Sequence, residues 1–353
     1  DVGEFSKILS RTETEADLIN FKARKVKSKL DGKIRGVGIC YYIESILGDP
    51  SETARIEFTE AQKVNLYVGT QSNGQDHETV YRQILHEDTG ISINDINIVQ
   101  GDSDLIPTGG GTGGSRSVTT QGTATKATAA KAIKQFELFL TEHHGLKEIS
   151  FDLGAFRSNS SNIVITITEA ANLARKLNRQ DLLIVSQTTT LPGRSYPNGC
   201  HICEVEIDIS TGTTEVVKYT VVDDLGTLIN PMLARGQVHG GVVQGIGQAI
   251  NEHVVYDENG QLLTATFMDY SLPRADNIPL IEFYSEPVPS TANPLGMKGC
   301  GEAGTVGALS AVANAVQDAL WEHGIHQVDM PFTPIRVWSW LNSNDNSVAK
   351  LKN

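Results

Sequence analysis

Short β-rich runs alternate with helical segments along the whole chain, and this alternation most constrains how the chain can fold. Apolar residues take every second position over 64–68, which predicts a half-buried strand. Two β-rich runs, 201–209 and 216–222, flank a Ser-Thr-Gly-Thr turn and predict a hairpin. Helical spacing is found at 1–30, 77–85, 122–142, 236–250 and 303–322. Because strand pairs are interleaved with helices, the sequence predicts an α+β fold with two mixed α/β lobes instead of a doubly wound parallel sheet.

A cluster of Pro, Gly and Asn between residues 191 and 199 is the best boundary between two lobes. The 353 residues suffice for two domains. We expect an N-terminal helical connection over 1–31, a first lobe over 32–190 and a second lobe over 191–345.

Composition narrows the class of protein. With 39% hydrophobic and 20% charged residues the chain has the balance of a globular protein. Its 29 basic and 42 acidic residues give a net charge of −13, which argues against nucleic acid and anionic lipid as partners. No apolar stretch approaches the ~20 residues of a membrane span. The four cysteines are scattered, which suits a reducing compartment, so the sequence predicts a cytoplasmic protein.

The glycine-rich run 109–114, followed by Ser115 and Arg116, lies between a predicted strand and a predicted helix. Glycines and a helix start favour close approach of an anion to backbone amides. A phosphate loop of the nucleotide hydrolases is disfavoured, because serine and arginine replace its lysine and its Ser/Thr. A flexible surface loop and an anion site both remain open, and the arginine tips the interpretation towards the anion site.

Three other patterns have two interpretations each. Residues 299–304 fit G-x-G-x-x-G, but no apolar strand precedes them, so a dinucleotide site is rejected. Within that run Glu302 is either a general base or an ordinary exposed carboxylate at a helix start, and the residues alone favour the second. Gln244 and Gln248 stand on one helix face with two glycines, which suits either a heterocyclic ligand or close packing. Cys200 and Cys203 lack a second ligand pair, so zinc is not expected.

Five segments together resemble the molybdopterin-binding large subunit of the molybdenum hydroxylases, the family of xanthine dehydrogenase, aldehyde oxidase and aerobic carbon monoxide dehydrogenase. The resemblance runs over nearly the whole chain. It is carried by Val68–Thr79, Gly113–Ser117, Val222–Gly226 with Ile229–Pro231, Gly236–Gln248 and Asn293–Gly304.

The resemblance implies a chemistry for these segments. Enzymes of this family oxidise a substrate with a water-derived hydroxide at a molybdenum centre, and a glutamate takes the hydroxide's proton. Glu302 matches that glutamate, and we expect it to be buried among its small neighbours. No metal ligand is expected in the chain itself. The residues implied to hold the pterin and its phosphate tail are Gly74, Gln75, Asp76, His77, Thr112, Gly113, Gly114, Ser115, Arg116, Gln244, Gly245 and Gly247.

The resemblance also implies partners. The family's large subunit is about twice this length, so the chain matches its C-terminal part and is expected to be a split subunit, a truncated product or an expressed fragment that needs the N-terminal half. The cofactor would be molybdopterin, either as such or in its cytosine dinucleotide form. The [2Fe-2S] clusters and FAD would belong to an iron-sulfur subunit and an FAD subunit. The Glu-Ala-Gly at 302–304 looks more like the aldehyde and N-heterocycle hydroxylases than the carbon monoxide branch. The alternative is a non-catalytic assembly or interface module.

Overall fold

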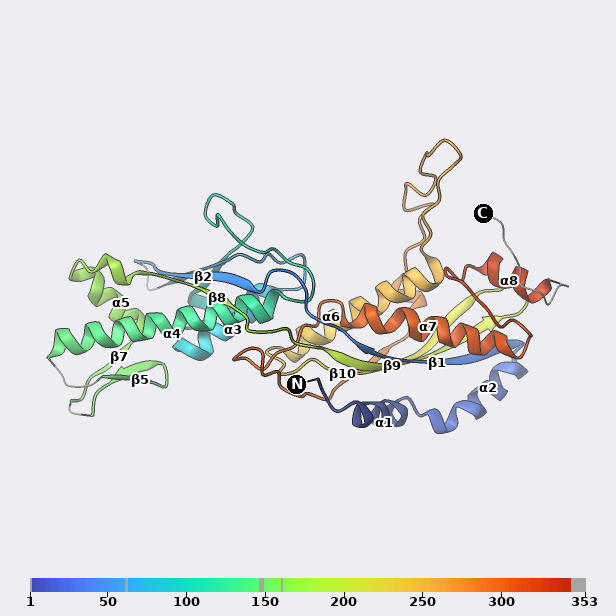
Figure 1. The fold of residues 1–353 in the computed structure, drawn as a ribbon, viewed down its shortest axis with the longest axis horizontal. Helices are drawn as coiled ribbons and strands as arrows, with labels where there is room; N and C mark the ends of the chain where they lie inside the picture. Colours follow the sequence, from blue (N-terminus) through green and yellow to red (C-terminus); the bar gives the residue numbers. More distant parts are fainter. Residues whose placement is uncertain (1, 61–62, 146–148, 160, 344–353) are drawn as a thin grey trace.

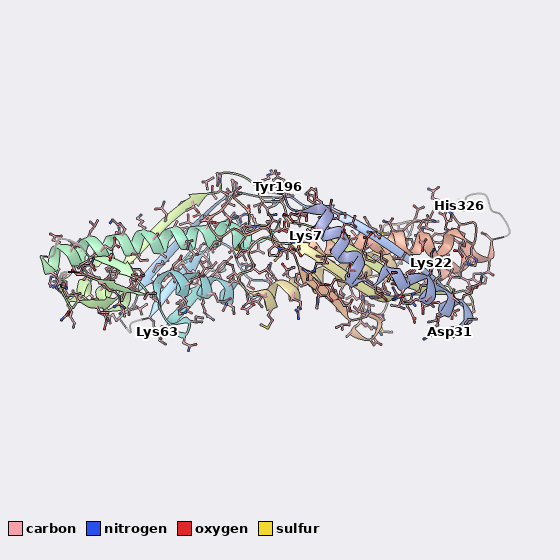
Figure 2. All side chains as sticks on the ribbon, turned by 90° about the horizontal axis from the view of Figure 1, so that it is seen from below. Lys7, Lys22, Asp31, Lys63, Tyr196 and His326 are labelled. Atoms are coloured by element: carbon pink, nitrogen blue, oxygen red, sulfur yellow. The ribbon has the colours of Figure 1, made fainter. Side chains whose placement is uncertain are left out.

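The computed structural model describes residues 2–60, 63–145, 149–159 and 161–343. It is elongated, with two parts lying end to end along its longest axis, and each part is built on a four-stranded sheet (Figure 1). Tyr196, labelled in Figure 2, lies between the two parts. The sheets are mixed and carry helices, so the predicted α+β class is confirmed.

Sheet A forms one part, with its strands in the order β1 (Lys33–Ile43), β9 (Asn198–Asp208), β10 (Thr214–Asp224) and β11 (Ile281–Ser285). The predicted hairpin is β9 with β10, and β11 adds in parallel. Helices α6 (Pro231–Ile246) and α7 (Ala303–Trp321) lie on one face, whereas α1 (Phe5–Glu15) and α2 (Phe21–Leu30) lie on the other (Figure 1). Because both faces are covered, β9 is buried along almost its whole length.

Helix α7 approaches β1 very closely because the strand carries glycines where they meet. A Cβ on Gly38 would lie 2.0 Å from the carbonyl oxygen of Ala311, and one on Gly36 would lie 2.0 Å from that of Ala315. The helix presents alanines at four-residue spacing, which places them on one face. This contact fixes the axis of α7, and Glu302 stands at its N-terminus.

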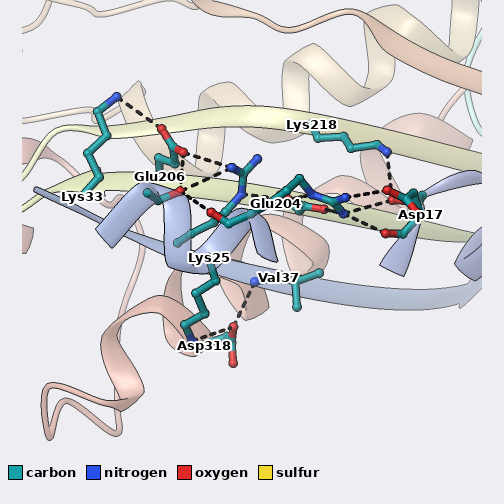
Figure 3. A network of polar contacts seen from close by, with 12 residues as sticks. Asp17, Lys25, Lys33, Val37, Glu204, Glu206, Lys218 and Asp318 are labelled. Carbon is teal, nitrogen blue, oxygen red and sulfur yellow. Dashed lines mark hydrogen bonds and ion pairs between the residues drawn. The ribbon is translucent and has the colours of Figure 1, made fainter. Parts of the chain in front are cut away.

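Polar contacts attach α2 to sheet A (Figure 3). The buried carboxylate of Glu204 on β9 pairs with Arg24 of α2 at 2.6 Å and with Arg35 of β1 at 2.8 Å. Glu206, two residues along β9, accepts a hydrogen bond from Ser28 at 2.6 Å and pairs with Arg35 at 3.1 Å. The N-terminal helices are therefore part of the sheet A layer.

Sheet B forms the other part, in the order β4 (Ile96–Val99), β3 (Val64–Val68), β2 (Ser51–Phe58) and β8 (Ile184–Thr190). Helix α4 (Ser117–His144) packs on β2 and β8, and α3 (His77–Thr89) packs on α4. Beyond them lies a small sheet of β5 (Ser150–Asp152), β6 (Ala155–Arg157) and β7 (Val164–Thr166), next to α5 (Ile167–Lys176). A last helix, α8 (Pro334–Asn342), follows α7 in sequence.

Two segments cross between the parts side by side. The amide of Glu44 donates to the carbonyl of Pro197 at 2.8 Å, and that of Leu191 donates to the carbonyl of Pro50 at 3.0 Å. Although β1 falls within the range 32–190 assigned to the first lobe, it pairs along its whole length with β9 of sheet A, because the chain crosses to sheet B only after residue 43. The division at 32 and 191 stays a prediction, and its end at 345 lies outside the described residues.

Helix α4 begins earlier than predicted, in a stretch that is rich in threonine. The helix predicted over 122–142 begins five residues earlier, at Ser117. Its first turns are rich in β-branched threonines, which favour strands in isolation, but here their hydroxyls return to helix carbonyls, as Thr119 does to Arg116 at 2.7 Å. At the turn around 257–260 the structure has one isolated bridge, between Tyr256 and Leu262. Within the described ranges no helix is both long and apolar enough to cross a membrane.

Candidate functional site

A cavity of about 300 Å³ lies where the two parts meet. Its walls come from the start of α3, the glycine-rich run and first turn of α4, the segment from 225 to 237, and the residues before α7. A second hollow shares four lining residues with it, which are Asn73, Gln75, Leu233 and Gln237. The two hollows together form an extended site suited to an elongated ligand.

Four helices begin at this cavity. His77 is the first residue of α3, Ser117 is the first residue of α4, Asn230 caps α6 and Glu302 is the N-cap position of α7, and all four line the cavity. A helix N-terminus carries roughly half a positive charge and unpaired amide N–H groups. The cavity is therefore suited to a phosphate-bearing ligand, even though the whole chain is acidic.

Two cations beside the cavity, Arg116 and Lys298, are already paired within the chain. Arg116 is buried; its guanidinium donates to the carboxylate of Glu52 at 2.7 Å and to the backbone carbonyls of Asp49, Ser51 and Gly111. It does not line the cavity, and it fastens the glycine-rich run to β2. Lys298 does line it, but its ammonium pairs with Asp224 at 2.5 Å. Attraction for an anion thus comes from amides and helix ends.

Glu302 is held by the glycine-rich run. The amide of Gly114 donates to its Oε1 at 3.2 Å, and the hydroxyl of Ser115 contacts its Oε2. Ser115 has a left-handed backbone with φ of 57°, a conformation that costs a non-glycine residue energy and is common at functional sites. The predicted burial of Glu302 is wrong for the described chain, because its glycine neighbours have no side chains to cover it and it is exposed.

A second carboxyl group, Glu44, lies on the other side of Ser115. Its Oε1 is 2.6 Å from the Ser115 hydroxyl, and its Oε2 is buried without a hydrogen-bond partner among the described residues. Burial, reinforced by the charges of Glu302 and Asp223 and opposed by the serine hydrogen bond, raises the pKa of Glu44 to about 7. Sequence reasoning missed Glu44, since a glutamate directly after an apolar strand carries no signal of its partners 71 residues away.

His77 contributes a buried imidazole to the cavity wall. Burial lowers the pKa of His77 to about 4, so the ring is neutral at pH 7. Its Nδ1 is buried and has no hydrogen-bond partner within the part of the chain that the structure describes. An unpaired polar atom in a cavity wall is a ready contact for a polar ligand.

The structure brings together about half of the residues proposed from sequence. Those that line the first cavity are Gln75, His77, Thr112, Gly113, Ser115 and Glu302. Gly74 lines the second hollow, Gly114 donates to Glu302, and Asp76 caps α3 by accepting from the backbone amide of Thr79. On α6, the side chain of Gln244 accepts from Thr305 at 3.0 Å and Gly245 packs on Ala308 of α7. Gln244, Gly245 and Gly247 line neither hollow.

Known proteins share this architecture. The family model for the molybdopterin cofactor-binding domain matches residues 11–279. The chain is 33% identical over 325 residues to the carbon monoxide dehydrogenase large chain of Afipia carboxidovorans, which covers 87% of this chain and 40% of that one. The chain belongs to the molybdenum hydroxylase family. Within that family it is also 31% identical to the 6-hydroxypseudooxynicotine dehydrogenase complex subunit gamma of Paenarthrobacter nicotinovorans, over 96% of this chain and 44% of that one.

Solved structures of molybdenum hydroxylases agree with the fold. The crystal structure of the Cu,Mo-CO dehydrogenase matches with a TM-score of 0.86 at 31% identity, over 96% of this chain and 45% of that one. Quinoline 2-oxidoreductase from Pseudomonas putida 86 matches with a TM-score of 0.85 at 28% identity, over 96% and 46%. The chain spans less than half the length of the curated relatives named above. It is a partial molybdopterin-binding subunit of this family.

The residues present fit such a cofactor. The cavity offers amide side chains for a pterin ring, helix N-termini for a phosphate and the unpaired Nδ1 of His77 as a further polar contact. Gly113 adds an exposed stretch of backbone, because nothing lies within 4 Å of the place where its Cβ would be. Because the two hollows share four lining residues, they offer adjoining space for a pterin and its phosphate tail.

Proposed function

We propose that this chain is the molybdopterin-binding part of a molybdenum hydroxylase in which Glu302 is the general base. The supporting observation is the position of its carboxylate, at the wall of the cavity where four helices begin. A general base must stand within hydrogen-bond reach of the proton that it takes. The exposure of Glu302 leaves its carboxylate accessible from that cavity.

The residues of the chain divide the work. When bound, the cofactor supplies the two-electron oxidation of the substrate, with oxygen that comes from water. The amide of Gly114 and the hydroxyl of Ser115 orient the Glu302 carboxylate by donating to its two oxygens, and Glu302 accepts the proton. Gln75, His77 and Thr112 hold the ligand from the side of α3 and the glycine-rich run. Preorganised donors of this kind lose little energy to rearrangement during the reaction.

The remaining parts of the enzyme are proposed to lie on other chains. The N-terminal half of the subunit would close the site, and an iron-sulfur subunit and an FAD subunit would carry electrons away in the cytoplasm. The cysteines Cys40, Cys200, Cys203 and Cys300 are free thiols. Among the described residues, no group of three or more His, Cys, Asp or Glu side chains is placed to hold a metal ion, so the clusters are assigned to a partner. The cofactor is proposed in its cytosine dinucleotide form.

The substrate is proposed to be an aldehyde or an N-heterocycle. Relatives named for quinoline and for 6-hydroxypseudooxynicotine support an organic substrate, and a further relative, from Paenarthrobacter nicotinovorans, is named nicotine 6-hydroxylase large subunit. Carbon monoxide is less favoured because the Glu-Ala-Gly at 302–304 resembles the aldehyde and heterocycle branch, although the large chain from Afipia carboxidovorans is a relative of comparable identity.

Co-expression with the missing half and the redox subunits tests this function. Glu302→Gln is expected to lower the turnover number by ~10²–10⁴, the usual loss for a general base, while molybdenum per complex stays at the wild-type value. Glu87→Gln, an exposed carboxylate on α3, is the matched control and should behave as wild type. Full turnover in a molybdenum-loaded Glu302→Gln complex would contradict the base assignment. A complex that takes up no molybdenum would favour the assembly module instead.

A further inference from the structure

One hydroxyl group lies between two carboxyl groups beside the cavity. Ser115 Oγ is 2.6 Å from Glu44 Oε1 and also contacts Glu302 Oε2. The backbone amide of Glu302 donates to Ser115 Oγ at 3.1 Å. Ser115 thus has three hydrogen-bond partners, of which two are carboxyl oxygens and one is a donor.

Hydrogen-bond counting restricts the protonation of this group. A serine hydroxyl has one proton to donate and two lone pairs that accept. The amide of Glu302 occupies one lone pair, which leaves one donation and one acceptance for the two carboxyl groups. Two ionised carboxylates can only accept, so both contacts cannot be hydrogen bonds. Both contacts are ordinary hydrogen bonds when one of the two carboxyl groups carries a proton.

The surroundings decide which carboxyl group holds it. Besides Ser115 and Glu302, the titratable groups that act on Glu44 or lie beside it are Asp223 of β10, Tyr42 of β1 and Cys300 before α7. All of them are neutral or negative. Burial raises the pKa of Cys300 to about 12 and that of Glu44 to about 7. Glu302, by contrast, is exposed to solvent and accepts a hydrogen bond from the amide of Gly114.

We propose that Glu44 is a positioning residue that holds the shared proton, so that Glu302 stays ionised and oriented. Glu44 then donates its O–H to Ser115 Oγ, and Ser115 donates to Glu302 Oε2. With the amide of Glu302 on the second lone pair, every position of the serine oxygen is used. The proposal rests on the proposed function, since it explains how Glu302 is kept ready to accept a proton. When Glu44 ionises, two carboxylates compete for one hydroxyl proton and Glu302 loses a donor.

The isolated chain, without cofactor, tests the sharing by infrared spectroscopy across pH 4–10. The carbonyl band of a protonated carboxylic acid should persist into the neutral range in the wild-type chain and disappear with a midpoint near pH 7. Glu44→Gln should remove this band, and the exposed Glu87→Gln should leave it in place. Glu302→Gln should keep the band but move its midpoint to lower pH, because a negative neighbour is gone. Absence of the band in the wild-type chain, or its persistence in Glu44→Gln, overturns the proposal.

Turnover in the assembled complex supplies a second measurement. The turnover number of the wild type should fall as pH rises through about 7, whereas that of Glu44→Gln should stay level over the same interval, since glutamine cannot ionise and its amide can still donate to Ser115. A merely structural role for Glu44 would lower the rate at every pH without changing the profile. The infrared result does not depend on catalysis. An active Glu302→Gln enzyme would therefore refute the proposed base and leave the shared proton standing. An inactive Glu302→Gln enzyme, together with no acid band in the wild-type chain, would refute only the shared proton.

Discussion

Replacing Glu52 with glutamine removes one charge from the buried ion pair that fastens the glycine-rich run to β2. The Glu52 carboxylate and the Arg116 guanidinium are both buried and lie 2.7 Å apart. Removing one partner of such a pair typically costs ~3–5 kcal/mol, because the other charge stays buried without compensation. Glutamine can still accept from the amide of Gly110, which donates to Glu52 at 2.8 Å, so we expect a loss at the lower end, ~3 kcal/mol.

Urea unfolding of the isolated chain measures this loss. Arg116→Met should cost a similar amount, and the double variant should cost less than the sum by ~2 kcal/mol, since neither charge is then left alone. Asp181→Asn, which breaks the solvent-exposed pair with Arg179, is the matched control and should change the unfolding midpoint little. Additive losses, or a Glu52→Gln chain as stable as wild type, would refute the reasoning. Either result would mean that Glu52 does not hold Arg116, which would leave Arg116 available for the anion-binding role that the sequence suggests.

Two further predictions concern the cavity wall and the seat of α7. Burial lowers the pKa of His77 from 6.5 to about 4, so between these pH values the unfolded chain binds a proton that the folded chain does not. The free energy of unfolding should therefore fall by up to ~3 kcal/mol as the pH drops from 6.5 to 4. His77→Gln should lack that loss. Urea unfolding at pH 7 and pH 4.5 compares the two chains, and equal losses would contradict this account. Gly38→Ala should lower stability by ~1–3 kcal/mol, because its Cβ would lie 2.0 Å from a carbonyl oxygen of α7. Thermal unfolding measures this loss. Gly193→Ala is the control, because nothing lies within 4 Å of the place where its Cβ would be. An unshifted melting temperature for Gly38→Ala would show that α7 can move away at little cost.

Local sequence was sufficient for much of the secondary structure and for the family. The strand at 64–68, the hairpin of β9 with β10 and the helix that begins after Glu302 follow from periodicity and turn residues, which act over a few positions. The short strands of the small sheet and the parallel strand β11 were not predicted from local pattern. Each has five residues or fewer, and its pairing partner rather than its own composition makes it a strand.

The sequence by itself determined the family, the candidate base Glu302 and the glycine-rich run beside it. Only the tertiary structure decided that four helices begin at one cavity and that Arg116 forms an ion pair with Glu52. It also decided that Glu44 and Glu302 contact the same hydroxyl group, that of Ser115. The physical reason is distance along the chain. A helix start is set by neighbouring residues, whereas the charge state and partner of a buried group depend on residues 64 to 187 positions away.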